Sequence, residues 1–557
     1  MMIPITYQED YSEVITDRLD NGGSVSSWES FVMAYDTAQH LLVPEFKGLQ
    51  CPSHLPQVDF LPHQVECAQK VIEDMNGRAI LADEVGLGKT IEAGLILKEY
   101  MIRGLVKKIL ILAPASLVNQ WVNELQQKFY IPAAAYRKGY NWDQHDIFVT
   151  SIDTAKRDGH RQQILEQHYD MVIIDEAHKL KNHKTKNYEF CQQLNKTYCL
   201  LLTATPVQNK LSELFNLVTI LKPGHLGTYE QFTDHFGNHR SKLKEDAYLK
   251  QLIQHVMVRN SRQQTGLDWT KRKVQNITID FSEEEKQVYD FLSTNKQERT
   301  SFLNLTLLRE LCSSREACYM TLREQFKKED LSENRRKFFE ELASKIEQMP
   351  HHSKAKRVIE LIQQEPENEK FIIFTEYRAT QLYLQWFLQQ HGISSVPFRG
   401  GFKRSKKDWM KQLFKQHAQV LIATEAGGEG INLQFCHNMI NYDLPWNPMR
   451  LEQRIGRIHR FGQEEDVHIY NFAIKDTVED QVLTLLYEKI QLFERVIGDL
   501  DDVLQELNIS NIEEEVSSIF ASSESVGEAK IKMENLSSVI AYTQQKKEQE
   551  YEARNYS

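Results

Sequence analysis

The chain has 557 residues, 41% hydrophobic and 26% charged, which is typical of an ordinary globular protein and not of a membrane or disordered one. No apolar run approaches the roughly 20 residues that span a bilayer. The start lacks an export signal, and seven scattered cysteines without a C-x-x-C pair indicate reduced thiols, so we expect a cytoplasmic protein. The net charge of -11 does not exclude a polyanionic partner, because residues 51–500 hold 60 Lys and Arg against 58 Asp and Glu.

Short apolar runs alternate with helical patterns in two regions of the chain. The predicted strands are 78–82, 108–115, 146–151, 171–175 and 198–205, and then 370–377, 394–400, 418–427, 438–445 and 466–474. Continuous apolar strands separated by helices are typical of parallel sheets covered on both faces. We therefore predict an α/β protein with two parallel sheets joined by helical material.

The remaining segments complete the predicted organisation. Residues 1–56 form an acidic extension. The first α/β region is 57–258, with a helical, polar insertion at 207–258. A linker and helical protrusion cover 259–350, with 259–275 as the polar, basic linker. The second α/β region is 351–485, and 486–557 is a helical, acidic tail.

The segment "LADEVGLGKTIEAGLIL" (81–97) follows a predicted strand and opens a helix. Its glycines allow backbone N–H groups to surround phosphate, Lys89 can reach the β- and γ-phosphates, and the Thr90 hydroxyl can hold Mg²⁺. The strict G-x-x-x-x-G-K-[ST] pattern fails at its first position, where Asp83 stands, so a Gly-rich turn is the alternative. The predicted nucleotide-binding residues are Asp83, Glu84, Val85, Gly86, Leu87, Gly88, Lys89 and Thr90, with Gln64 upstream for the adenine edge.

The segment "MVIIDEAHKLKN" (171–182) ends a predicted strand in two acids. Beside a phosphate-binding loop, one carboxylate can hold Mg²⁺ and a second can orient the attacking water. We assign the first role to Asp175 and the second to Glu176. His178 is predicted to couple the acids to the hydroxyls of "TATP" (203–206), and "KLKN" has no predicted role.

These motifs, in this order, resemble helicase superfamily two and, within it, the Swi/Snf-like translocases. The similar stretches span roughly residues 57–480 and include "LPHQ", "ILAPASLVNQW", "VTSIDTAKR", "LLTATPVQNKLSELFNL", "MVRNSR", "FIIFTEYRAT", "LIATEAGGEGINLQ" and "YDLPWNPMRLEQRIGRIHRFGQ". "ADEVGLGKTIEAGLI" and Glu429 look closest to the bacterial RapA-related branch.

The resemblance implies two RecA-like P-loop NTPase lobes that hydrolyse ATP, with Mg²⁺, in the cleft between them. Thr90 and Asp175 would hold the metal. The second lobe would supply Gln453, Arg457 and Arg460 from one helix face, with an arginine reaching the phosphates. A solvated basic helix face is the alternative for these arginines.

Duplex DNA is the partner that the resemblance implies. Only 18 residues, 434–451, separate "GINL" from "EQRIGR", which leaves little room for a strand-separating hairpin. Contacts should go to phosphates without sequence preference, on the face away from ATP. The candidates are Ser116, Thr150, Ser151, Arg399, Gly400, Thr424, Gly427 and Gly428.

The expected activity is therefore an ATP-dependent double-stranded-DNA translocase that remodels or displaces DNA-bound proteins. The alternatives are a strand-separating DNA or RNA helicase, a RapA-like factor that acts on RNA polymerase, and a non-catalytic scaffold. We expect no membrane partner. The acidic residues 1–50 are interpreted as a solvated extension, with restraint of the motor by DNA mimicry as the alternative.

Overall fold

The computed structural model consists of two compact units, Met1–Gly48 and Leu49–Ser557. The residues described are 16, 20, 27–41, 48–137, 139–203, 211–236, 252–260, 262, 265–266, 269–294, 302–328, 331–402, 404–424, 431–484, 512–523, 527–529, 531–536 and 538–539. Within the first unit, α2 (Trp28–Leu41) carries exposed Trp28, Phe31, Met33 and Tyr35. No helix among the described residues is long and apolar enough to cross a membrane, and all seven cysteines are buried and free of disulfides.

The first sheet has seven strands in the order β3-β4-β2-β5-β6-β1-β7, and all of its pairs are parallel. The five predicted strands are confirmed, and the sheet adds two two-residue strands that the sequence did not reveal. The strands are β1 (Arg78–Leu81), β2 (Ile109–Leu112), β3 (Ala134–Ala135), β4 (Ile147–Thr150), β5 (His168–Asp175), β6 (Asn195–Leu202) and β7 (Met257–Val258).

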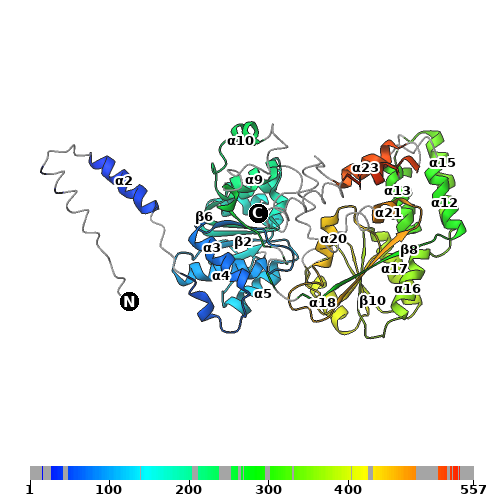
Figure 1. Cartoon of the computed structure of the whole chain (residues 1–557), viewed down its shortest axis with the longest axis horizontal. Coiled ribbons are helices and arrows are strands. Elements are labelled where there is room, and N and C mark those ends of the chain that lie inside the picture. Colours follow the sequence, from blue (N-terminus) through cyan, green and yellow to red (C-terminus); the bar gives the residue numbers. More distant parts are fainter. Residues whose placement is uncertain are drawn as a thin grey trace, which may run out of the picture. The chain divides into compact units, whose positions relative to one another are not determined.

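Helices cover both faces of the first sheet (Figure 1). One face carries α3 (Pro62–Glu73), α4 (Lys89–Ile102) and α5 (Val118–Phe129). The other carries α6 (Ile152–Ala155), α7 (Asp158–Leu165), α8 (Lys186–Gln193), α9 (Leu211–Leu221) and α10 (Tyr229–Phe236), with the short η2 (Ala177–Leu180) nearby. The prediction of a polar insertion at 207–258 is wrong for α9, because Leu214, Leu217 and Leu221 are buried in the core of the sheet. Residues 204–210 and 237–251 lie outside the described part.

The "KLKN" segment ties α9 to the end of β5. Lys181 Nζ lies 3.2 Å from Glu213 Oε2, and Asn216 Nδ2 donates a 2.7 Å hydrogen bond to the Lys181 carbonyl. Both partners belong to α9. This segment, which had no predicted role, therefore anchors a buried helix beside the acidic pair.

The second sheet has six strands in the order β10-β11-β9-β12-β13-β8, again with every pair parallel. The five predicted strands are confirmed. The prediction that 259–275 is wholly a linker is wrong at its end, because β8 begins at Arg272 and pairs with β13 over eight residues. β8 is an edge strand whose one side is largely solvated, so it carries polar residues. It therefore lacks the continuous apolar run by which the other strands were predicted. The strands are β8 (Arg272–Ile279), β9 (Phe371–Thr375), β10 (Ser395–Phe398), β11 (Val420–Thr424), β12 (Asn438–Asn441) and β13 (Val467–Ile474).

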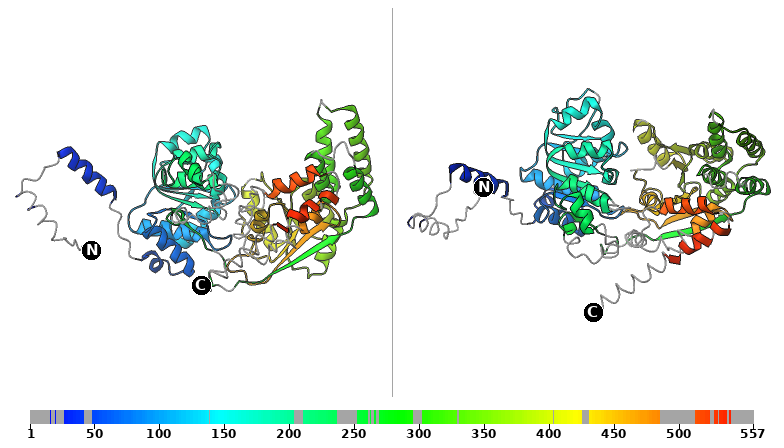
Figure 2. Two further views of the ribbon diagram at one scale, coloured as in Figure 1. Left: turned by 45° about the horizontal axis from the view of Figure 1, so that its top comes forward. Right: turned by 90° about the horizontal axis from the view of Figure 1, so that it is seen from above.

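The helices before β9 pack onto the second sheet and share its core, through Leu292, Leu311 and Phe339 (Figure 2). They are α12 (Glu283–Thr294), α13 (Phe302–Ser313), α14 (Arg315–Phe326), α15 (Glu333–Glu347) and α16 (Ser353–Gln363), followed by α17 (Arg378–Gln390). The other face of the sheet carries α18 (Arg404–Gln416) and α20 (Pro448–Ile455), with α21 (Val478–Leu483) after β13. From the predicted tail, α23 (Ile512–Ser522) is helical as expected, and Val516 and Met533 are buried in the same core.

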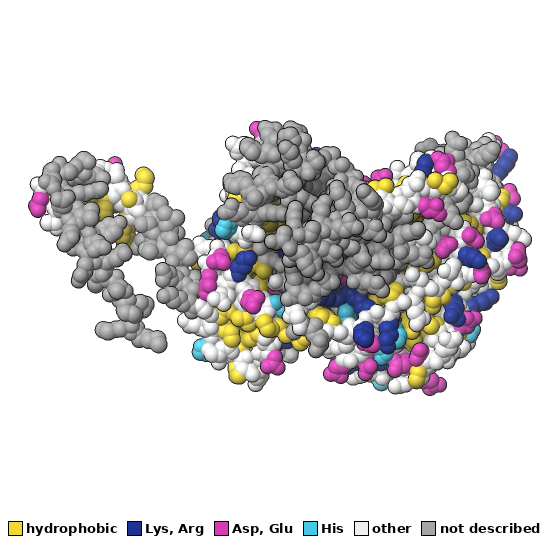
Figure 3. All heavy atoms as spheres, viewed as in Figure 1, with side chains coloured by type: hydrophobic (Ala, Val, Ile, Leu, Met, Phe, Trp, Pro, Cys, Tyr) yellow, Lys and Arg dark blue, Asp and Glu magenta, His cyan; other side chains and the backbone are white. Residues whose placement is uncertain are grey.

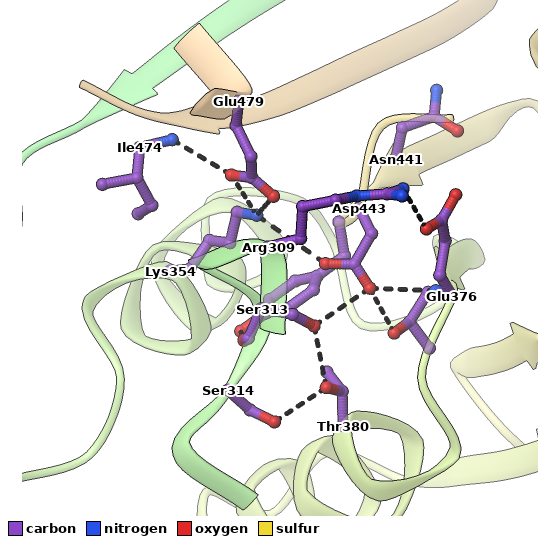
Figure 4. Close-up of polar contacts among 12 residues, drawn as sticks. Arg309, Ser313, Ser314, Lys354, Glu376, Thr380, Asn441, Asp443, Ile474 and Glu479 are labelled. Carbon is purple, nitrogen blue, oxygen red and sulfur yellow. Dashed lines mark hydrogen bonds and ion pairs between the residues drawn. The ribbon is translucent and has the colours of Figure 1, made fainter. Parts of the chain in front are cut away.

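A buried polar network fastens α13 and α16 to the ends of β9, β12 and β13 (Figure 4). Lys354 Nζ lies 2.7 Å from both carboxylate oxygens of Glu479 and 3.8 Å from Asp443 Oδ1. Asp443 Oδ2 accepts hydrogen bonds from the hydroxyls of Ser313 and Thr375. Lys354 is completely buried, so its charge is balanced by partners and not by water.

Candidate functional site

The predicted phosphate-binding loop connects β1 to the N-terminus of α4. Gly86 and Gly88 adopt the left-handed conformation, with φ of 96° and 98°, which favours glycine and turns the chain sharply into the helix. α4 begins at Lys89, and Thr90 is half-buried in its first turn. Lys89 Nζ donates to the carbonyls of Asp83, at 2.5 Å, and Glu84, at 3.2 Å. Burial lowers the pKa of Lys89, although the charge of Glu176 opposes the shift.

Gln64 is committed to this loop. Its Nε2 donates to the Leu87 carbonyl at 2.9 Å and its Oε1 accepts from the Leu61 N–H. A Cβ on Gly88 would approach Gln64 Nε2 to 2.5 Å, so the amide braces the loop from behind. Both polar atoms that the sequence interpretation reserved for adenine are thus occupied by the chain itself.

The side chains of Asp83 and Glu84 also hold protein groups. Asp83 Oδ1 accepts the Asn260 N–H at 2.8 Å, and Asp83 Oδ2 accepts from Asn260 Nδ2 at 3.0 Å. Glu84 Oε2 accepts the Arg262 N–H at 3.1 Å. These two acids thus lie against the segment that leaves the first sheet, and the Glu84 N–H is also committed to it, through the Asn260 carbonyl.

A second cluster lies beneath the loop, where potential ligand atoms of His63, Asp83 and Glu92 are within 4.8 Å of one another. All three residues are buried. Burial and the charge of Asp83 raise the pKa of Glu92 far above its usual range. Asp83 in this cluster already accepts hydrogen bonds from Asn260, and the raised pKa favours the protonated form of Glu92.

The predicted acids end β5 at the carboxyl edge of the sheet. Asp175 Oδ2 accepts from Trp121 Nε1 at 2.9 Å, and its Oδ1 accepts the Glu176 N–H at 2.8 Å. Glu176 has a φ of 52°, a strained backbone for a residue with a side chain. The two carboxylates have different partners, because Asp175 contacts Trp121 and Glu176 contacts His178.

The pKa values of the two acids are shifted in opposite directions. Burial and the charge of Glu176 raise the pKa of Asp175 to about 6. Burial alone would also raise the pKa of Glu176, but the hydrogen bond and charge of His178, with Arg457, outweigh it and hold that pKa at about 2. His178 Nδ1 lies 3.1 Å from Glu176 Oε2. His178 therefore contacts Glu176. Of its predicted partners at 203–206, Thr203 is described and buried, and 204–206 lie outside the described residues.

The arginines of the second lobe reach the acids of the first. A pocket is lined by Pro114, Leu117, Glu176, His178, Lys179, Gln453 and Arg457. A Cβ on Gly86 would lie 3.5 Å from the Arg460 Cα. Burial lowers the pKa of Arg460, while the charges of Glu124, Asp175 and Glu176 oppose the shift. The single helix face predicted for these residues is wrong, because α20 ends at Ile455 and the two arginines follow in turns.

The candidate DNA contacts lie at the carboxyl ends of strands in both sheets. Thr150 ends β4 and Ser151 caps α6 through the Thr154 N–H, while Ser116 follows the neighbouring β2. In the second sheet, Arg399 and Gly400 follow β10 and Thr424 ends the adjacent β11. Gly427 and Gly428 lie outside the described residues. Each described set is grouped at one end of its sheet, and β2 is the neighbour of β5, the strand that carries the acids.

Three residues of the site were missed from the sequence. Trp121 holds Asp175, while Arg262 and His459 bridge the loop and the second lobe. In the sequence, only their positions could have indicated a role. Arg262 lies in "MVRNSR" and His459 in "RIHR", and both segments resemble motifs of the family.

Comparison with known proteins is consistent with this geometry. A family model described as the SNF2-related domain matches residues 58–354, and one described as the helicase conserved C-terminal domain matches residues 353–462. The "Uncharacterized ATP-dependent helicase YqhH" of Bacillus subtilis (strain 168) is 58% identical over 554 residues, which are 98% of this chain and 99% of that protein.

More distant relatives were also found. The RNA polymerase-associated protein RapA of Proteus mirabilis (strain HI4320) is 25% identical over 527 residues, and the match covers 85% of this chain but 53% of RapA. The Sulfolobus solfataricus SWI2/SNF2 ATPase core, solved in complex with dsDNA, is 22% identical to this chain. The match covers 85% of this chain and 98% of that one, with a TM-score of 0.39.

The family model covers more than half of the chain and YqhH matches nearly all of it. The chain therefore belongs to the SNF2-related family and is an ATP-dependent helicase/ATPase of that family.

Proposed function

We propose that this enzyme is an ATP-dependent translocase on double-stranded DNA that displaces or remodels DNA-bound proteins. Its motor would consist of lobe 1, residues 57–258, and lobe 2, residues 351–485, joined by the linker and helices of 259–350. ATP would bind between the lobes, with its phosphates on the loop at 83–90. We infer a cytoplasmic, nucleoid-associated protein.

One observation carries the proposal. Glu176 of lobe 1 and Gln453 and Arg457 of lobe 2 line the same pocket, and Arg460 approaches the phosphate loop. A site built from two bodies can respond to the presence of the γ-phosphate by closing or opening, because each body makes contacts that the other alone cannot. That response is what a motor needs.

The donor set suits Mg²⁺. Thr90 offers a hydroxyl and Asp175 a carboxylate, and Mg²⁺ prefers oxygen ligands of this kind. Asp175 is a buried acid beside a second acid, so a cation would relieve the repulsion between them. When bound, the ion would neutralise charge on the β- and γ-phosphates.

The chain's own residues would do the remaining work. Lys89 and the N–H groups of the loop would hold the phosphates. Glu176 stays ionised at neutral pH because its pKa is about 2, and it would orient the attacking water by accepting its hydrogen bond. Arg457 and Arg460 would stabilise the charge that develops on the transferred phosphoryl group.

DNA would be gripped through its phosphates by hydroxyl, backbone and basic groups at the strand ends. In lobe 2, Arg399 and Lys406 lie over the ring of Phe402 at 4.8 and 4.4 Å, which keeps two cations beside the end of β10. On the face that Figure 3 shows, the described surface mixes both signs of charge. A local basic group on a balanced body suits binding that depends on phosphates and not on sequence.

The test is hydrolysis of ATP with and without nucleic acids. We expect duplex DNA to stimulate hydrolysis more than single-stranded DNA or RNA, with stimulation falling as salt rises. Lys89→Ala and Glu176→Gln should each abolish hydrolysis. Displacement of a third strand from a triplex would report movement along the duplex. Equal hydrolysis with and without every nucleic acid would rule the proposal out.

A strand-separating helicase is the second candidate, because YqhH is called a helicase. A labelled partial duplex separates the two, and we expect little unwinding because the 434–451 segment is short. The RapA likeness suggests RNA polymerase as one client. Proteins retained by Glu176→Gln in cells would identify it or another DNA-bound protein.

A further inference from the structure

The segment that leaves lobe 1 does not hang free of the phosphate loop. The Ala82 N–H donates to the Val258 carbonyl at 2.8 Å, and the Glu84 N–H donates to the Asn260 carbonyl at 3.1 Å. The pairing of β1 with β7 is thus extended past the end of the strand and along the loop. Because Asp83 and Glu84 also accept hydrogen bonds from Asn260 and Arg262, the linker and the loop form one hydrogen-bonded unit.

Arg262 then connects this unit to lobe 2. Its Nη2 donates to the Val85 carbonyl at 2.7 Å and to the His459 carbonyl at 3.2 Å. Its Nη1 donates to His459 Nδ1 at 2.8 Å, and its guanidinium carbon lies 4.7 Å from the centre of the Trp269 ring. A planar fork with fixed donor directions can make these contacts together, whereas a lysine ammonium cannot.

His459 is built to accept these donors. Its Nδ1 also accepts from Arg272 Nε at 2.9 Å, and its Nε2 lies 2.9 Å from the Thr270 carbonyl. Burial, together with the charges of Arg272 and Arg262, lowers the pKa of His459 to about 3. The ring is therefore neutral, with its hydrogen on Nε2 and its Nδ1 free to accept.

The position of His459 gives the contact its consequence. It stands between Arg457 and Arg460 in the chain, so fixing its backbone carbonyl fixes the turn that carries both arginines. Arg272 continues the connection to the neighbouring helix, with Nη1 2.7 Å from Glu452 Oε1, directly before Gln453. One linker residue thus touches the phosphate loop on one side and the arginine turn on the other.

We propose that Arg262 is a positioning residue for ATP hydrolysis, which joins the Val85 carbonyl of the phosphate loop to His459 and thereby sets where Arg457 and Arg460 stand relative to the phosphates. This inference rests on the proposed function for the roles of the two arginines. A shift of the loop on nucleotide binding would reach the arginines through the same guanidinium. Opening of the lobes would break the hydrogen bonds of Arg262 to Val85 or His459, and the cost of leaving these groups unpaired opposes opening.

The experiment compares the full-length chain with Arg262→Ala, Arg262→Lys and Lys273→Ala. Lys273 is the matched control, since this basic residue of the same segment is half-exposed and pairs with Asp466. We expect Arg262→Ala to lower kcat for ATP about 10- to 100-fold, as expected for misplaced groups, with KM for ATP changed less than about threefold. Arg262→Lys should recover little of the loss, and Lys273→Ala should match wild type.

Combination with Arg457→Ala distinguishes positioning from a merely structural role. If Arg262 acts through the arginines, Arg262→Ala should lower kcat less in an Arg457→Ala chain than in wild type, because one of the two groups that it positions is already absent. Losses that multiply, full activity of Arg262→Lys, or a fall in kcat explained by a lower Tm would overturn the inference. If Arg262→Ala does not fold, Arg262→Lys decides on the same readouts.

The two proposals fail differently. Absence of duplex-DNA stimulation in the wild-type chain would remove the translocase and leave the basal comparison intact. Normal kcat in Arg457→Ala would remove the role of that arginine. An impaired Arg457→Ala beside a normal Arg262→Ala would remove only the positioning role.

Discussion

Both sheets have carboxylates and a lysine near the carboxyl ends of their strands, and the two groups are used in opposite ways. In the second lobe, Lys354 faces Glu479 and Asp443, and hydroxyl groups complete the contacts of Asp443 (Figure 4). In the first lobe, Lys89 contacts only backbone carbonyls among its described hydrogen bonds, and Glu176 is held by His178 in a strained turn. The group of Lys354, Glu479 and Asp443, in which the charges are paired, is the saturated cluster, and it fixes structure. The group of Lys89, Asp175 and Glu176 is the open cluster, and it has capacity for a ligand.

The largest expected effect breaks the saturated cluster. Lys354→Met would leave the carboxylates of Glu479 and Asp443 buried without their cation, which costs about 3–5 kcal/mol. We expect urea unfolding to shift to lower concentration by the corresponding amount, while kcat per folded molecule changes little. Glu176→Gln should do the reverse, with unfolding unchanged and hydrolysis lost.

A paired substitution provides the control for this result. Lys354→Met/Glu479→Gln removes a charge on each side of the closest contact and should recover part of the stability, because fewer unpaired charges stay buried. If Lys354→Met unfolded at the same urea concentration as wild type, the network would not contribute the stability that its geometry indicates.

A smaller effect, on kcat, is expected at the contact between the phosphate loop of the first lobe and the arginine turn of the second. A Cβ on Gly456 would lie 2.2 Å from Val85 Cγ1, so Gly456→Ala must push the arginine turn away from the phosphate loop. We expect kcat for ATP to fall about tenfold, since displacements of this size misplace reacting groups. Gly456→Ala/Val85→Ala makes room again and should regain most of the rate. Equal rates for the single and double variants would refute the contact.

The smallest effect concerns a titratable group near the saturated cluster. Burial raises the pKa of Glu310 to about 7, although Thr321 and Arg309 oppose the shift. Because the folded pKa lies above the ordinary value of 4.5, the stability that protonation contributes is complete below that value and is lost as pH rises through about 7. At pH 8, Glu310→Gln should therefore be more stable than wild type by about 1 kcal/mol.

Unfolding at pH 5.5 and pH 8 measures this difference. Glu341→Gln, at an exposed site on α15, is the control and should follow wild type at both values. A Glu310→Gln curve parallel to wild type across this range would contradict the assignment.

The two clusters also differ in whether the sequence alone could predict them. The open cluster was readable, because a phosphate loop and an acidic strand end are short motifs with their own chemistry. The saturated cluster was not, because Ser313, Lys354, Asp443 and Glu479 come from four distant segments with no shared pattern. The edge strand β8 was not predicted for a related reason, since its polar side faces water and the strand lacks a continuous apolar run.

What the sequence determined by itself was the set of strands, the order of the motifs and the residue types at the nucleotide site. These depend on periodicity and on contacts within a few residues. What only the tertiary structure decided was which partners the polar groups chose. Gln64 braces Leu87, and Arg262 joins Val85 to His459, across 177 and 197 residues of chain. Such pairings depend on tertiary packing, within lobe 1 for Gln64 and between the lobes for Arg262 and His459, which no local pattern encodes.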